Sequence, residues 1–322
     1  MITGVWNLKK KKFSRNGKSK SLEEVYILDD KTKNIYDNLE AQISKIAKHT
    51  RQGSFKTRGR YYEAAKRFSL FLAEVYKIQR FANISDKHIE AYIDLMQSKG
   101  LSASTIKTDL SAIRYFLDHV DNPRNTLSKN EKYNLEKRVF GGVDRTWSQN
   151  EFEKMIKLAR EQGFERVANA MELSRYLGFR IHEVFRIDRA IAEAALRNGR
   201  ITIKGKGGKE RTIELPIKAR KVLEDIIQNV NRGQKLFVNQ DEKTHIVIKE
   251  IQNWIDRNRE YCIDPDRNIN MTFHGLRHTR ASLAYKEDIK LGMSELEARK
   301  NVSKLLGHER DDVTRIYING RE

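Results

Sequence analysis

Six polar side chains in the second half of the sequence are of the types that cleave a phosphodiester bond. In chain order they are Arg180, Lys206, His274, Arg277, His308 and Tyr317. Such a reaction needs an attacking oxygen, cations that hold the phosphate oxygens as charge builds, and a proton donor for the leaving oxygen. Tyr317, nine positions after His308, offers the attacking oxygen. The pattern therefore predicts phosphoryl transfer through a tyrosine, with no metal and no ATP.

The two arginines are expected to hold the phosphate. Arg180 lies in the segment YLGFRIHEV, on an expected helix that places Glu183 one turn away to orient it. Arg277 follows His274 by three positions, so both side chains project from one helical face. Two guanidiniums grip one phosphate from two sides with planar donors, a geometry that lysine does not reproduce.

Lys206 and His308 are expected at two turns of the chain. Lys206 lies in the turn GKGGK of an expected hairpin, whose glycines let the backbone come close to a DNA strand. A lysine on such a tip would protonate the leaving oxygen. His308 follows Gly307, which is expected to end a helix that begins near Ser294. Its imidazole would leave the helix end at a fixed point and bond a phosphate oxygen.

These segments together resemble the tyrosine recombinase family, the phage-integrase and Xer-like site-specific recombinases. The matching motifs are GFRIHEV around Arg180, ITIKGKGGKERTIELP around Lys206, FHGLRHTRAS around His274 and Arg277, LLGH ending at His308, and TRIYI around Tyr317. They occur in the family's order and with its nine-residue step from the last histidine to the tyrosine. The resemblance is strong over about residues 147–317 and looser over about residues 36–120.

The resemblance implies a mechanism, a partner and an assembly. Tyr317 would form a 3′-phosphotyrosine bond and release a 5′-hydroxyl. The 5′-hydroxyl of a second strand would then attack the phosphotyrosine and complete strand exchange without a cofactor. The implied roles of the others are phosphate stabilisation by Arg180 and Arg277, protonation of the leaving oxygen by Lys206, acid or base action toward the tyrosine by His274, and a phosphate bond from His308. The partner would be double-stranded DNA, bound by a dimer at each site and a tetramer in synapsis.

Other interpretations fit parts of this pattern. A type IB topoisomerase would use the same chemistry without exchanging strands between partners, and plasmid relaxation without synapsis would favour it. A noncatalytic DNA-binding regulator would keep the fold, and Tyr317→Phe would leave its activity unchanged. His274 and His278 could bind a metal, but no ligand spacing supports one. Taken singly, Tyr317 is more often a half-buried aromatic, so the order and spacing of all six residues carry the prediction.

Composition points to a polyanionic partner. The chain has 322 residues, a formal net charge of +19 and a pI near 9.8, and each phosphate that Lys or Arg neutralises releases counterions. The sequence has no long apolar run and no secretory signal, which favours nucleic acid over a membrane surface. The single cysteine, Cys262, fits a reducing cytoplasm. We therefore expect a cytoplasmic protein of prokaryotic or phage type that associates with the nucleoid. The run from Lys9 to Lys12 is either a solvated tail or a phosphate contact.

Periodicity predicts a mainly α protein with one small β-hairpin (α+β), and the resemblance implies that its two parts are a helical core-binding domain and a catalytic domain. Tyr61, Ala65, Phe68, Leu72 and Val75 share one helical face. A hairpin is expected over residues 200–215, where Ile201 and Ile203 alternate with polar residues before the glycine turn. The expected regions are a basic tail over 1–34, a helical DNA-binding domain over 35–120, a basic linker over 121–146 and the catalytic domain over 147–322.

The helical domain offers two candidates for DNA contact. Lys107 and Arg114 lie on the polar side of a helix whose apolar stripe includes Ile106, Leu110 and Ile113. We expect the two domains to clamp the duplex from two sides, with phosphate contacts supplying most of the affinity.

Overall fold

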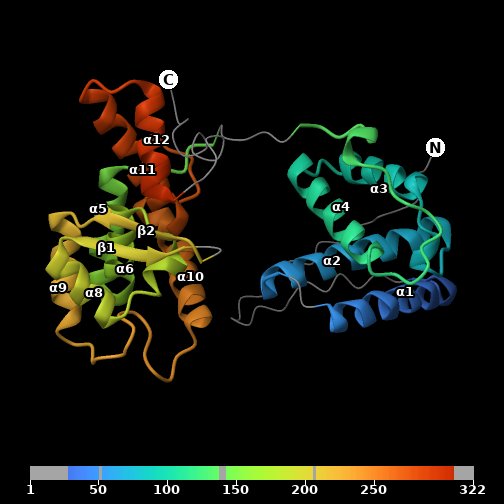
Figure 1. Ribbon diagram of the computed structural model, residues 1–322, viewed down its shortest axis with the longest axis horizontal. Helices are drawn as coiled ribbons and strands as arrows, with labels where there is room; N and C mark the ends of the chain where they lie inside the picture. The colour runs from blue at the N-terminus through green and yellow to red at the C-terminus, as the bar shows by residue number, and fades with distance from the viewer. Residues whose placement is uncertain (1–27, 51–52, 138–142, 206–207, 308–322) are drawn as a thin grey trace. The chain divides into compact units, whose positions relative to one another are not determined.

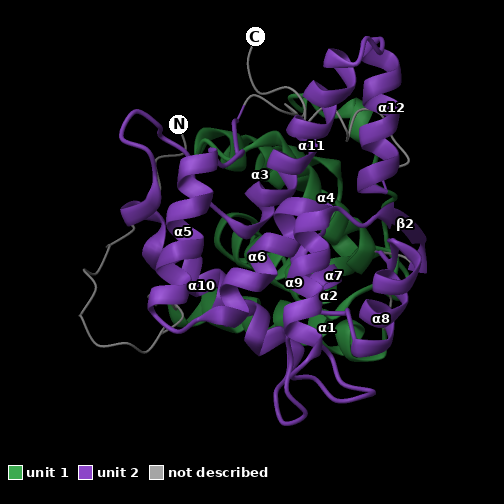
Figure 2. Cartoon of the chain, turned by 90° about the vertical axis from the view of Figure 1, so that its left-hand side faces the viewer, with its two compact units in different colours: residues 1–138 green, residues 139–322 purple. Residues whose placement is uncertain are grey.

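The chain folds into two compact units, residues 1–138 and 139–322 (Figures 1 and 2). The computed structural model describes residues 28–50, 53–137, 143–205 and 208–307. Within these ranges the protein is mostly helical, with one two-stranded antiparallel sheet. The expected fold class is therefore confirmed. No helix in the described ranges is long and apolar enough to cross a membrane.

In its described residues, unit 1 is a small bundle of four α-helices. The helices are α1 (Asp30–His49), α2 (Phe55–Phe71), α3 (Asp86–Ser98) and α4 (Ala103–Leu117). The side chains of Asp29, Ser54 and Ser102 cap the N-termini of α1, α2 and α4, each by accepting a bond from a backbone N–H three residues on. The core is rich in aromatic rings, because Tyr92 of α3 lies 4.9 Å from Phe68 and 5.2 Å from Phe71 between ring centroids.

The helix α2 does not continue its apolar stripe as the sequence suggests. A π-helical turn over Leu72–Tyr76 follows α2. A π turn adds one residue to the helical repeat and so rotates the side chains that follow it. Val75, expected on the buried face, is 44 % exposed as a result, while Leu72 stays buried.

Part of the expected linker belongs to unit 1. The backbone N–H and hydroxyl of Ser128 donate to the Asp86 carboxylate at 2.9 and 2.6 Å, and the Tyr133 hydroxyl donates to it at 2.7 Å. Tyr133 is also buried in the core of the bundle. The first part of 121–146 therefore packs on the N-terminus of α3, which periodicity alone does not reveal. At the other end, α1 begins at Asp30, inside the expected tail.

Unit 2 surrounds a single large core with eight helices and the hairpin in its described part. The helices are α5 (Gln149–Glu161), α6 (Glu165–Leu177), α7 (Ile181–Val184), α8 (Arg189–Asn198), α9 (Ile217–Ile227), α10 (Thr244–Cys262), α11 (Phe273–Lys290) and α12 (Glu295–Leu306). Capping boxes are present at Ser148 and Ser294, closed by Glu151 and Glu297, and both can be read from the sequence spacing. Helix α11 packs against both α6 and α12 (Figure 1).

The expected hairpin is present. Strand β1 (Arg200–Lys204) pairs antiparallel with β2 (Glu210–Glu214), and Ile203 lies opposite Arg211. Ile201, Ile203 and Ile213 face the core, as their alternation with polar residues predicts. At the end of β1, the Arg186 guanidinium donates to the Lys204 carbonyl at 2.8 Å and so ties the hairpin to the residues after α7.

Helix α11 begins under a close backbone crossing. The backbone N–H of Trp147 donates to the Thr279 hydroxyl at 2.8 Å, and the indole ring of Trp147 is buried. A Cβ added to Gly275 would lie 2.6 Å from the Trp147 indole nitrogen and would also clash with the Arg145 carbonyl. Glycine is therefore required where the start of unit 2 crosses the first turn of α11.

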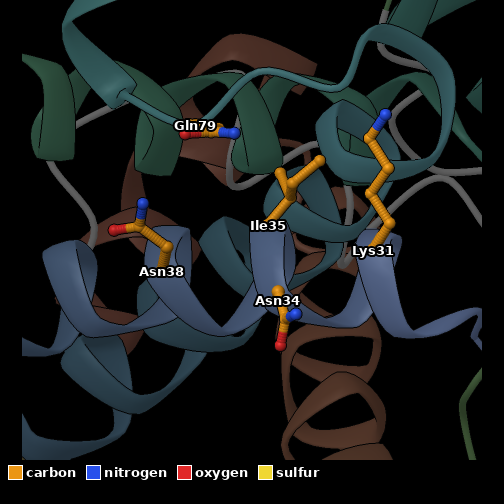
Figure 3. Close-up of a pocket in the computed structure, with 5 residues that line it drawn as sticks. All are labelled: Lys31, Asn34, Ile35, Asn38 and Gln79. Atoms are coloured by element: carbon orange, nitrogen blue, oxygen red, sulfur yellow. The ribbon is translucent and has the colours of Figure 1, made fainter.

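A surface hollow of about 540 Å³ lies on unit 1, apart from the residues discussed below. Figure 3 shows the side chains that line it, Lys31, Asn34, Ile35, Asn38 and Gln79. Gln42 of α1, the helix that also carries Lys31 to Asn38, donates to the Gln79 carbonyl at 2.7 Å. This bond holds the segment around Gln79 against α1. The lining contains one charged side chain and amides, without a cluster of groups that would do chemistry.

Candidate active site

Arg180 is held at the start of a short helix by a buried glutamate. Gly178 ends α6 in a left-handed conformation, and Arg180 is the extended residue just before α7 rather than a residue within a helix. Its backbone N–H donates to Glu183 Oε2 at 2.8 Å, and its guanidinium donates to Glu183 Oε1 at 3.0 Å. The Arg180 side chain is 24 % exposed. Glu183 thus orients Arg180 as the sequence predicts, with part of the guanidinium open to a ligand.

Glu183 has two further arginines around it. Arg211 donates to Oε1 at 3.0 Å and to Oε2 at 2.7 Å, and the Arg277 guanidinium lies 3.9 Å from Oε2. Burial raises the pKa of Glu183, but the hydrogen bonds from Arg211 and the Arg180 backbone, with the charges of Arg211 and Arg277, outweigh it and lower the pKa to about 2. The carboxylate is therefore charged at any physiological pH.

Arg277 is fully buried between two helix ends. Its guanidinium donates to the Gly178 carbonyl at 2.5 Å and to the Leu306 carbonyl at 2.6 Å. Gly178 follows α6 and Leu306 is the last residue of α12. Carbonyls at helix C-termini lack partners within the helix and carry partial negative charge, so they suit a buried cation. A phosphate can reach Arg277 only if the groups that cover it move.

His274 and His278 lie one turn apart on α11. Their rings meet edge to face, with centroids 5.0 Å apart. His274 has part of its surface open to solvent and His278 is buried. Desolvation of the ring, followed by the charges of Arg277 and Arg180, lowers the pKa of His274 to about 4. Burial, with His274 and Arg145 nearby, lowers the pKa of His278 to about 3. Both imidazoles are neutral at pH 7.

Three of the six expected residues lie outside the described residues: Lys206, His308 and Tyr317. The described residues end next to two of them, at Gly205 before Lys206 and at Gly307 before His308. The Gly205 N–H donates to the Lys209 carbonyl at 2.6 Å across the base of the hairpin turn. Gly307 ends α12 in a left-handed conformation, as expected from its place before His308. The structure thus brings Arg180, His274 and Arg277 into one region of unit 2.

The sequence that forms this region matches a known family. The phage integrase family matches residues 145–322, more than half of the chain, and the N-terminal domain of phage integrases matches residues 36–123. The chain belongs to the phage integrase family. Like other members, this integrase is a tyrosine-type site-specific recombinase.

The named relatives agree with this assignment. Tyrosine recombinase XerC of Natranaerobius thermophilus is 24 % identical over 271 residues, which cover 80 % of this integrase and 86 % of the relative. Tyrosine recombinase XerC of Vibrio cholerae is 23 % identical over 290 residues, which cover 84 % and 85 % of the two chains.

Solved structures share the fold. The lambda integrase dimer bound to a COC′ core site has a TM-score of 0.61 and 18 % identity, over 94 % of this integrase and 84 % of that chain. The XerH site-specific recombinase in its pre-cleavage complex with difH substrate has a TM-score of 0.59 and 19 % identity, over 88 % and 81 %. At these identities, the likeness establishes the fold of the integrase.

Arg211 is a site residue that the sequence reasoning missed. It lies on the same side of β2 as the inward-facing Ile213, since side chains two positions apart in a strand share a face. Its side chain is only 9 % exposed. Arginine at an inward-facing strand position is the signal that was available, because a buried charge requires a partner. The partner is Glu183, three positions after Arg180.

Lys107 and Arg114, the candidates for DNA contact, face the polypeptide instead. The Lys107 ammonium donates to the Glu136 carbonyl at 2.7 Å. The Arg114 guanidinium donates to Asn130 Oδ1 at 2.6 Å and to the Ser128 carbonyl at 2.8 Å. Both side chains therefore fasten the segment after α4 to unit 1. This geometry disfavours their role in DNA contact, which stays a prediction.

Proposed function

We propose that this integrase cleaves and rejoins DNA strands at specific sites through a 3′-phosphotyrosine bond at Tyr317, without metal or ATP. The observation that carries the proposal is the Arg180 guanidinium, oriented by a buried carboxylate and partly open to solvent, within a matched phage integrase region. Buried Arg277 and the histidines of α11 lie around the same point of the fold.

The chemistry follows from the residue types. The Tyr317 oxygen forms a bond to phosphorus while the bond from phosphorus to the 5′-oxygen breaks, and Lys206 gives its proton to that oxygen. Arg180 and Arg277 stabilise the charge on the non-bridging oxygens, with a further bond from His308. The pKa of His274 is about 4, so this imidazole is neutral at pH 7 and takes the proton that the Tyr317 hydroxyl loses, returning it when the step is reversed. A second 5′-hydroxyl reverses the step and completes strand transfer.

Double-stranded DNA is the proposed partner. The net charge of +19 supports a polyanion, and the XerH and lambda integrase structures described above are complexes with DNA. Lambda integrase forms a dimer on a core site and a tetramer on a Holliday junction, which supports a dimer at each site and a tetramer in synapsis here. Residues 35–120 and 147–322 would then bind the duplex together as DNA-binding and catalytic domains. The proposed location is the cytoplasm, on the chromosome.

Trapping the covalent complex tests this proposal. The protein is incubated with fragments of its source genome, denatured in SDS, and the DNA ends attached to protein are sequenced. We expect attached ends at a defined site, and we expect Tyr317→Phe to bind DNA in a mobility-shift assay without forming the adduct. Tyr261→Phe is the matched control, because Tyr261 is an 80 % exposed tyrosine of α10. An adduct that persists in Tyr317→Phe means that another residue is the nucleophile.

A further inference from the structure

We propose that Arg211 is a positioning residue for the reaction, acting on Arg180 through the carboxylate that they share. The inference rests on the proposed function. Arg211 donates to both oxygens of Glu183, whereas the Arg180 guanidinium donates to Oε1. Within the described residues, Glu183 is the one hydrogen-bond partner of the Arg180 guanidinium. The remaining N–H groups of Arg180 are therefore available to a phosphate.

The division of the carboxylate between two arginines determines the direction of the Arg180 guanidinium and how many of its N–H groups pair with Glu183. A carboxylate has two oxygens and binds a guanidinium most strongly through both. If Arg211 is removed, Glu183 is left buried with less neutralising charge, and Arg180 is the nearest cation that can take both oxygens. Arg180 would then turn toward Glu183 and pair with both of its oxygens. Its guanidinium would no longer be oriented to stabilise the phosphate.

Arg211 is itself held on three sides. It is paired with Ile203 in the hairpin register. Its guanidinium carbon lies 5.4 Å from the centroid of the Phe179 ring, just before Arg180 in sequence. A Cβ added to Gly307 would lie 3.0 Å from Arg211 Cδ, so the end of α12 packs against its stem. The hairpin, the segment of Arg180 and the end of α12 therefore all meet at one side chain.

The test separates positioning of Arg180 from a general loss of structure. A methylphosphonate at the scissile position replaces one charged oxygen by a methyl group, so its reaction depends less on a cation at that oxygen. The substrate is a nicked duplex carrying the site mapped by covalent trapping, made with either the ordinary phosphate or the methylphosphonate. The readout is the rate of the protein–DNA adduct under single-turnover conditions.

We expect Arg211→Met to cleave the phosphate duplex about 100-fold more slowly, the usual effect of losing one donor from a charge-stabilising site. On the methylphosphonate duplex the loss should fall below about 10-fold, the pattern also expected for Arg180→Met. DNA affinity in a mobility-shift assay should stay within about threefold of the wild type, because Arg211 is buried and bonds protein groups. Arg200→Met is the matched control: Arg200 is on the same hairpin, its side chain is 64 % exposed, and it pairs with Glu214.

Arg211→Lys keeps a cation beside Glu183 but cannot bond both oxygens in the same planar geometry, and it covers the case in which Arg211→Met does not fold. It should show the same selective recovery on the methylphosphonate. Equal losses on both substrates, or wild-type cleavage by either variant, overturn the inference. If wild type and Arg200→Met form no Tyr317-dependent adduct at all, the proposed function fails instead.

Discussion

At the scale of single residues, one buried carboxylate organises the cations of the candidate site. Glu183 accepts hydrogen bonds from the guanidiniums of Arg180 and Arg211, and its Oε2 lies 3.9 Å from the Arg277 guanidinium. Three guanidiniums around one carboxylate leave an excess of positive charge in a region shielded from water, where charges act more strongly. An excess of positive charge in such a region favours a bound anion.

The buried His278 predicts how stability depends on pH. Its folded pKa is about 3, against an ordinary value of 6.5, so the unfolded chain binds the extra proton as the pH falls. Stability is therefore lost on acidification, by about 2 kcal/mol between pH 7 and pH 5 from this residue alone. Among the described residues, the charged and titratable groups that act on it are His274, Arg145, Arg277 and Asp144, and of these Asp144 favours the charged form.

Thermal denaturation at pH 7 and pH 5 measures this effect. We expect His278→Gln to lose less stability on acidification than the wild type. His245→Gln, a surface substitution in α10, is the matched control and should follow the wild type. Parallel pH profiles for His278→Gln and the wild type would contradict the prediction.

At the scale of elements, the sequence predicts what local chemistry determines. The capping boxes at Ser148 and Ser294, the hairpin and the end of α12 at Gly307 follow from side chains within a few residues of one another. The π turn after α2 and the packing of Tyr133 on Asp86 depend on tertiary contacts, so they could not be read from local periodicity.

The candidate site shows the same division. Arg180 and Glu183 are three residues apart, and their contact was predicted. The contact of Arg211 with Glu183 joins positions 28 residues apart and needed the fold. The enclosure of Arg277 by the ends of α6 and α12 needed it as well, because it brings together carbonyls far from Arg277 in sequence. Types and order of residues were thus readable, whereas their mutual contacts were not.

The crossing at Gly275 gives a prediction for helix α11. Alanine favours a helix over glycine by about 1 kcal/mol, but here its Cβ would clash with Trp147 and the Arg145 carbonyl. We expect Gly275→Ala to destabilise unit 2 by about 1–3 kcal/mol, the usual cost of overpacking. Calorimetry measures it. Gly59→Ala in α2 is the matched control, because its Cβ would meet open space, and it should stabilise unit 1 by about 0.5–1 kcal/mol. A Gly275→Ala variant more stable than the wild type would contradict the prediction, because it would show that Arg145 and Trp147 move aside at little cost in free energy.

At the scale of the whole molecule, the net charge of +19 predicts how binding responds to salt. If DNA affinity comes mainly from phosphate contacts, it should fall by about 10³-fold or more between 50 and 200 mM salt. Fluorescence anisotropy with the mapped duplex, repeated over this range, gives the slope. An affinity that hardly changes with salt would contradict a phosphate-dominated interface.

The same titration separates surface cations from internal ones. Lys107→Gln should keep the wild-type salt slope, because the Lys107 ammonium bonds the Glu136 carbonyl in unit 1. If Lys107 does contact a phosphate, its loss reduces the slope by about one. The result decides between the role expected from its place on the polar side of α4 and the role suggested by its contacts.

The shared use of Glu183 also determines how substitutions combine. Arg180 and Arg211 hydrogen-bond the same carboxylate and Arg277 lies 3.9 Å from it, so we expect the effect of replacing one to depend on whether another has already been replaced. Free-energy changes measured for single variants of this group will therefore not sum to those of the double variants. For anyone who redesigns the enzyme, the three arginines and their glutamate are one mutational unit, to be exchanged together or left alone.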